Sequence, residues 1–60
     1  MNMIEMTVTG VLTKPMQYED KDLWLVDVMA DAWGREMKTT VMKTTKEAAD
    51  AVVVGSKFEG

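Results

Sequence analysis

Residues 23–43 read LWLVDVMADAWGREMKTTVMK, with a turn signal at Trp33-Gly34 between two runs of strand-forming residues. In the first run, one face would carry Trp24, Val26, Val28 and Ala30, and the other would carry Leu23, Leu25, Asp27, Met29 and Asp31. Alternation with a period of two over this length indicates a half-buried β-strand. The stretch therefore predicts a β-hairpin, with Trp24 in the core and Trp33 at the surface.

The turn leaves two hairpin registers open. It has Asp at its first position and Gly at its fourth, as type I turns favour. A three-residue loop would place Lys38 opposite Val28 on the apolar face, whereas a four-residue loop over residues 32–35 would pair Val26 with Val41. Because a slip of one residue moves every side chain to the other face, burial should select the register. We expect the second register, whose apolar face carries a charge only near its end.

The N-terminal run, residues 3–13, alternates in the same way. One face would hold Ile4, Met6, Val8, Gly10 and Leu12, and the other would hold Glu5, Thr7, Thr9, Val11 and Thr13. Gly10 has no side chain to pack, which indicates a bulge or a sharp bend in this strand. Residues 14–22 interrupt the alternation with Pro15 and a charged run, so we expect a long polar loop there.

A short helix and a last strand are expected after residue 43. Thr44 and Glu47 have the spacing of a capping box, with Thr44 as the N-cap. The helix should run from about residue 45 to residue 51, and three of its residues should face inward: Ala48, Ala51 and Val52. Residues 56–59 should then form a short strand with Phe58 in the core.

The expected fold is mainly β with one short helix, in the order β-β-β-α-β, as a single domain of residues 1–60. The pattern resembles a minimal OB-type small β-barrel in its long first strand with Gly10, its tight Trp33-Gly34 turn, and residues 44–49 leading into residues 54–58. The resemblance implies a barrel whose first strand bends and serves both sheets. The alternative is a strongly curled, open antiparallel sheet with the helix lying across it.

The composition excludes most catalytic chemistry. The 60 residues include no His and no Cys, the residue types that supply most nucleophiles, neutral-pH bases and transition-metal ligands. Asp27 and Asp31 would lie roughly 13 Å apart along one strand, too far for a single metal ion or one acid–base pair. We therefore expect no enzyme activity, no cofactor and no metal.

The length predicts a domain of marginal stability. A chain of this size buries only about 60% of its unfolded surface, so association with a partner or a second copy is a natural reinforcement. The first residues lack the basic region and apolar core of a signal peptide. No apolar run approaches the roughly 20 residues of a membrane span. We expect a cytoplasmic protein with no membrane partner.

The charges are acidic in sum and segregated along the chain. The net charge is −3, which argues against a general phosphate-binding surface. Residues 19–31 carry five acids and one lysine, whereas residues 35–46 carry four bases and one acid. On neighbouring antiparallel strands, these two groups would form cross-strand pairs on a solvated face.

Two sets of residues are candidates for binding. In the expected pairing, Val11, Leu25 and Met42 form an apolar row on the outward face, with Leu23 beside it. A contiguous row of this kind indicates a contact surface unless the helix or the residue 14–22 loop covers it. The second set provides stacking and basic groups for single-stranded nucleic acid, the ligand that the OB resemblance implies, and consists of Tyr18, Trp33, Arg35 and Lys38.

We therefore expect a small non-catalytic protein-interaction or regulatory module, homodimeric or bound to another protein. Short bacterial or phage-encoded regulators are of this type. A single-stranded nucleic-acid-binding domain is the alternative.

Overall fold

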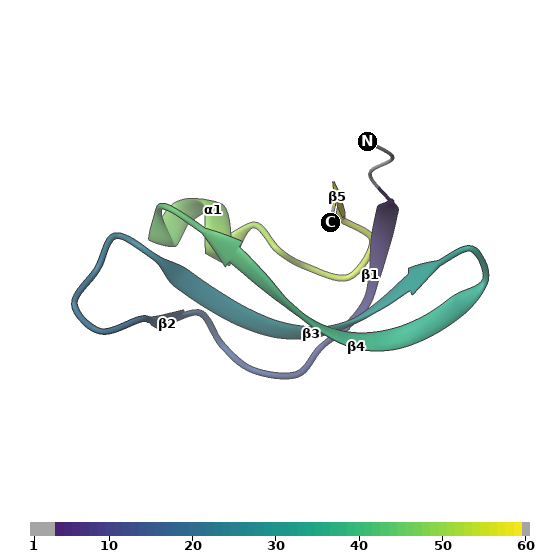
Figure 1. Cartoon of the computed structure of the whole chain (residues 1–60), viewed down its shortest axis with the longest axis horizontal. Helices are drawn as coiled ribbons and strands as arrows, with labels where there is room; N and C mark the ends of the chain where they lie inside the picture. The colour runs from purple at the N-terminus through teal and green to yellow at the C-terminus, as the bar shows by residue number, and fades with distance from the viewer. Residues whose placement is uncertain (1–3, 60) are drawn as a thin grey trace.

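The sheet is built around β3 (Trp24–Ala32), which pairs with β4 along one edge and with β1 and β2 along the other. The computed structural model describes residues 4–59 (Figure 1). The other elements in chain order are β1 (Glu5–Val11), β2 (Met16–Gln17), β4 (Arg35–Lys43), α1 (Lys46–Asp50) and β5 (Lys57–Glu59). All four strand pairings are antiparallel. The expectation of a mainly β fold with one short helix is confirmed.

The β3–β4 hairpin has the expected register, because Val26 pairs with Val41. The turn itself is tighter than expected, since Ala32 pairs with Arg35 and only Trp33 and Gly34 lie between the strands. Both have positive φ, 55° and 75° respectively, which is the type I′ geometry that matches the twist of paired strands. The expectations of a type I turn and of a four-residue loop are therefore wrong.

A bulge interrupts β1 where Gly10 indicated one. Val8 pairs with Ala30 and Gly10 pairs with Met29, so Thr9 is an extra residue between them. The extra residue reverses the alternation beyond it, and Val11 pairs with Val28. The expected continuous alternation through residue 13 is wrong for this reason, and Val11 does not lie beside Leu25.

The segment expected to be a long polar loop contains a strand. Met16 of β2 pairs with Leu25 of β3, and the chain then closes on itself through hydrogen bonds from Tyr18 N to Leu23 O at 2.9 Å and from Lys21 N to Tyr18 O at 3.0 Å. Two residues of this connection, Glu19 and Asp20, have positive φ. The pairing of β2 with β3 gives the sheet its fifth strand.

Helix α1 begins one residue later than expected. The N-cap is Thr45 rather than Thr44, because the extended backbone of Thr45 lets its hydroxyl accept a hydrogen bond from Ala48 N at 3.1 Å. Within α1 the buried residue is Ala49, and Ala51 is exposed. The inward position expected for Ala51 is therefore wrong, whereas Val52, just after the helix, is buried in the core as expected. No helix in residues 4–59 is long and apolar enough to cross a membrane.

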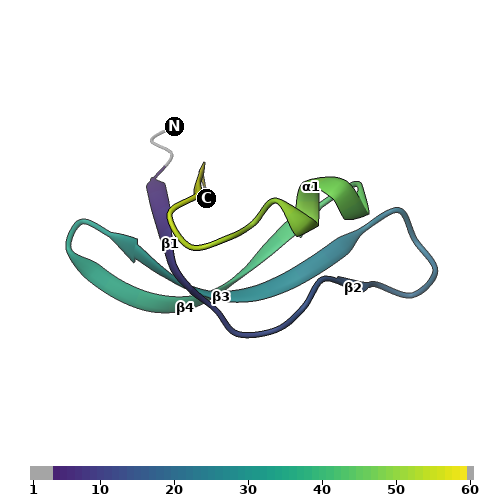
Figure 2. The ribbon, with the colours of Figure 1, turned by 180° about the vertical axis from the view of Figure 1, so that it is seen from behind.

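The core lies between the sheet and the segment that carries α1. It consists of small side chains: Val8, Val26, Val28, Ala30, Val41, Ala49 and Val52. Trp24 and Phe58, both expected in the core, pack against this cluster but are only half-buried. Figures 1 and 2 show α1 and the chain leading to β5 on the same side of the β3–β4 hairpin. We call the opposite face of β2, β3 and β4 the outer face.

The sheet is not closed. β5 pairs with β1 through Met6 and Phe58, but within residues 4–59 no ladder joins β4 to β5. The observed architecture is a curled antiparallel sheet with one helix across it.

Candidate functional site

An apolar row crosses the outer face on three adjacent strands. Met16 of β2 pairs with Leu25 of β3, and Leu25 pairs with Met42 of β4. Met16 and Met42 are each 65% exposed, and Leu25 is half-buried between them. We call these three residues the outer row. The expected row contained Val11 in place of Met16, and the bulge at Thr9 explains the difference.

The chain covers the outer row only in part. Strand β2 shields one side of Leu25, whereas α1 packs through Ala49 against the core on the opposite face. Of the other predicted contact residues, Leu23 is half-buried just before β3 and accepts the hydrogen bond from Tyr18 N. Val11 is exposed beside the apolar face, opposite Val28. The structure therefore brings together Leu25 and Met42 of the predicted set.

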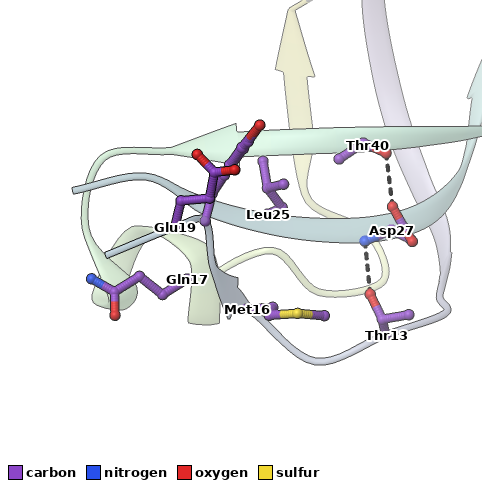
Figure 3. Close-up of a pocket in the computed structure, with 8 residues that line it drawn as sticks. Thr13, Met16, Gln17, Glu19, Leu25, Asp27 and Thr40 are labelled. Atoms are coloured by element: carbon purple, nitrogen blue, oxygen red, sulfur yellow. Dashed lines mark hydrogen bonds between the residues drawn. The ribbon is translucent and has the colours of Figure 1, made fainter. Parts of the chain in front are cut away.

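A groove of about 340 Å³ lies beside the outer row (Figure 3). It is lined by Thr13, Met16, Gln17, Tyr18, Glu19, Leu25, Asp27 and Thr40. The close-up shows Leu25 between Glu19 and Asp27, with the side chain of Met16 below Leu25 in this view. The groove therefore combines an apolar floor with acidic ends.

Asp27 is held in place by both neighbouring segments. Its backbone N donates to Thr13 Oγ1 at 2.9 Å, and its backbone O accepts from Leu12 N at 2.8 Å and from Thr13 N at 3.2 Å. Thr40 Oγ1 donates to Asp27 Oδ1 at 2.7 Å. These bonds fix the carboxylate at the groove and engage one of its two oxygens.

The outer face is acidic because of the hairpin register. Asp27 faces Thr40, and Asp31 faces Glu36, so two acidic residues are cross-strand partners. Lys38 pairs with Met29 between them. The Glu36 carboxylate also accepts a hydrogen bond from Thr9 Oγ1 at 2.7 Å. The expected cross-strand pairing of acids with bases is wrong: within residues 4–59 the one ion pair joins Lys57 Nζ to Glu5 Oε1 at 3.6 Å.

The predicted nucleic-acid residues are not gathered at one place. Trp33 is 82% exposed at the hairpin turn, whereas Tyr18 follows β2 at the other end of the hairpin (Figure 1). The length of β3 separates these ends by about 26 Å at the usual rise per residue. Arg35 adjoins the turn, Lys38 lies along β4, and Lys21 Nζ lies 5.7 Å from the centroid of the Tyr18 ring.

The outer row and groove include residues that the sequence pattern did not predict. Four of these residues lay in the expected loop or on polar strand positions: Met16, Thr13, Glu19 and Thr40. The alternation of Met16-Gln17-Tyr18 is too short to identify a strand. The described part of the chain has no group of three or more acidic, His or Cys residues that could hold a metal ion. Comparison with known proteins finds no matching family model, no similar curated protein and no similar solved structure.

Proposed function

We propose that this domain is a non-catalytic protein-interaction module that binds its partner through the outer row. The observation that carries the proposal is the contiguity of Met16, Leu25 and Met42, with both methionines 65% exposed. Single exposed apolar residues are ordinary, but a contiguous group is typical of a contact surface. Unbranched methionines adapt their shape to a partner, which suits a binding surface.

The rigidity of the surface supports the same proposal. The three side chains stand on paired strands rather than on a free loop, so little order has to be gained on binding. The core beneath consists of valine and alanine side chains. A domain with so small a core gains stability when a partner buries its outer face.

A second copy of the chain is the simplest partner, because an isologous contact needs only one surface. Such a contact through the outer row would, however, bring Glu19 and Asp27 of both copies close to one another. Like charges across an interface disfavour association. We therefore propose a different protein as the main partner, with self-association measured directly by sedimentation.

The experiment compares three forms of the protein in a capture from host extract: wild type, Met42→Lys and Val53→Lys. Both substitutions introduce a lysine at an exposed apolar position, but Val53 lies outside the outer row. A partner bound by the wild type and by Val53→Lys, and lost with Met42→Lys, is the expected result. Equal capture by all three folded forms would refute the outer row as the binding surface. Amide NMR spectra would verify folding.

A second candidate function is binding of single-stranded nucleic acid at the hairpin turn. The observation that favours it is Trp33, 82% exposed beside Arg35, because exposed aromatic rings stack on unpaired bases. Titration of an oligonucleotide against Trp fluorescence tests it. Sub-micromolar, salt-sensitive binding that Trp33→Ala abolishes would put this function first.

We also propose that the curled sheet is a small OB-like barrel left open between β4 and β5. Two observations support this. β1 pairs with both β3 and β5, as a strand shared by two halves of a barrel would. A hollow of about 390 Å³ lies between β4 and β5, which do not pair with each other in the described residues. The hollow is lined by Met6, Thr39, Thr40, Val41, Met42, Lys43, Phe58 and Glu59.

A further inference from the structure

The groove beside the outer row has a chemistry that specifies its occupant. Its floor is formed by the side chains of Met16 and Leu25, and its ends carry the carboxylates of Glu19 and Asp27. A purely apolar side chain would leave the carboxylates unmatched. A small cation would leave the apolar floor unused. A long side chain with an alkyl stem and a cationic end matches both parts.

We propose that the groove binds an arginine or lysine side chain from a basic segment of the partner protein. This inference rests on the proposed function and names the chemistry of the partner. The stem lies along Met16 and Leu25, and the cationic end meets the carboxylate of Asp27. Leu25 and Asp27 are two residues apart on one face of β3, roughly 6.6 Å at the usual strand rise, which is within reach of such a stem.

The electrostatics of the groove support a cation supplied from outside the chain. Within residues 4–59, neither Glu19 nor Asp27 takes part in an ion pair. Lys21 Nζ lies 5.7 Å from the centroid of the Tyr18 ring, which lines the groove, but Lys21 makes no ion pair with either carboxylate in the described residues. Thr40 engages only Oδ1 of Asp27, and a carboxylate can accept several further hydrogen bonds. A guanidinium or ammonium group would provide them as charge-assisted bonds, which are the stronger kind.

The backbone around Glu19 forms a tight turn beside the groove. Glu19 and Asp20 have φ of 48° and 55°, a region that residues other than glycine rarely adopt. The hydrogen bond from Lys21 N to Tyr18 O at 3.0 Å closes a tight turn over these two residues, and this turn accounts for their positive φ. Here the conformation accompanies a Glu19 carboxylate at the end of the groove opposite Asp27 (Figure 3).

The test uses n-butylguanidinium as the probe and follows NMR shifts of isotope-labelled protein. n-Butanol has the same stem without the charge, and guanidinium chloride has the charge without the stem. We expect n-butylguanidinium to shift the Leu25 and Met16 methyl signals and the Asp27 and Thr40 amides, with at least about a tenfold lower Kd than either control. n-Butylammonium measures the lysine version of the same contact.

Paired variants separate recognition from general attraction to an acidic protein. Asp27→Asn retains an oxygen that can accept from Thr40, so the fold should be preserved, and binding should weaken at least threefold. Asp31→Asn removes the same charge from the same strand and face outside the groove, and binding should stay unchanged. Equal weakening by both variants would overturn the proposal.

The remaining outcomes are also decisive. Equal binding of n-butanol and n-butylguanidinium would refute the cationic occupant and leave the outer row as an apolar contact surface. Shifts spread over Asp31 and Glu36, or none at the groove, would refute the groove as a site for a basic side chain. The proposed function is decided separately by the capture experiment with Met42→Lys, so the two failures are distinguishable.

Discussion

Replacing Trp33 by asparagine should stabilise this domain. Trp33 occupies the first central position of the two-residue β3–β4 turn with φ 55°, followed by Gly34 with φ 75°. Type I′ turns of this kind strongly prefer Asn-Gly, because asparagine tolerates the left-handed region that a bulky residue does not. Trp33→Asn therefore installs the preferred pair without changing the register of the hairpin.

The size of the effect follows from two opposing contributions. The left-handed conformation costs an ordinary residue roughly 1–2 kcal/mol, most of which asparagine avoids. Trp33 is 82% exposed, so removal of the indole sacrifices on the order of 0.5 kcal/mol of apolar burial. The net gain should be about 0.5–1 kcal/mol, equivalent to an increase in Tm of about 2–8 °C for a domain of this size.

Thermal unfolding is readily followed in this protein. The chain has two tryptophans, so the Trp33 variants leave the half-buried Trp24 as the single fluorescent reporter of the core. Trp33→Ala is the matched control, because it removes the same ring but keeps an unfavourable residue in the left-handed region. We expect Tm to rank Trp33→Asn above both wild type and Trp33→Ala. A Tm for Trp33→Asn at or below that of Trp33→Ala would refute the strain argument.

Four further substitutions test the core, the helix cap and the outer face by urea denaturation. Val28→Ala should lower the unfolding free energy by about 2–3 kcal/mol, since it empties a fully buried site; a loss below about 1 kcal/mol would contradict this core. Thr45→Ala should cost about 1 kcal/mol, and Thr44→Ala much less, because only Thr45 caps α1; the reverse order would reassign the cap. Glu36→Gln should add about 0.2–1 kcal/mol by removing the like charge opposite Asp31, and a gain that persists at high salt would contradict the electrostatic cause.

The hairpin was predictable because its two faces differ so strongly. Only one register places Val26 opposite Val41 and keeps Lys38 away from Val28, and burial selects that register. The turn type was less accessible. Asp31 and Gly34 suit a type I turn, and Trp33 is an unfavourable residue for type I′. The twist of the paired strands outweighed that local preference.

The helix cap shows the limit of a local motif. Thr44 and Glu47 have capping-box spacing, but Thr45 is an equally good N-cap residue by type. The choice between them depends on where β4 ends and how α1 lies on the core. Ala49 is fully buried, and this position sets the rotation of the helix. Such a one-residue displacement is decided by packing rather than by the threonines themselves.

The bulge and β2 were the features that sequence could not position. Gly10 indicated that β1 is irregular, but it did not distinguish an extra residue at Thr9 from a bend at Gly10. These two alternatives would place Val11 on opposite faces of the sheet. β2 has only two residues and follows Pro15 in a polar segment, too short for alternation to identify it. Both features change which residues neighbour Leu25. For this reason the outer row contains Met16 in place of the expected Val11.

The composition of the outer face is not explained by folding alone. The register that buries Val26 and Val41 on one side places Asp31 opposite Glu36 on the other, and Met16 and Met42 on the outer face are largely exposed. A face shaped only for stability would place opposite charges across the strands and polar residues in the exposed row. The outer face does neither, and its groove joins that exposed row to the fixed carboxylate of Asp27. The proposed contact with a basic segment of another protein would account for both departures, because such a segment would cover the methionines and neutralise the acids together.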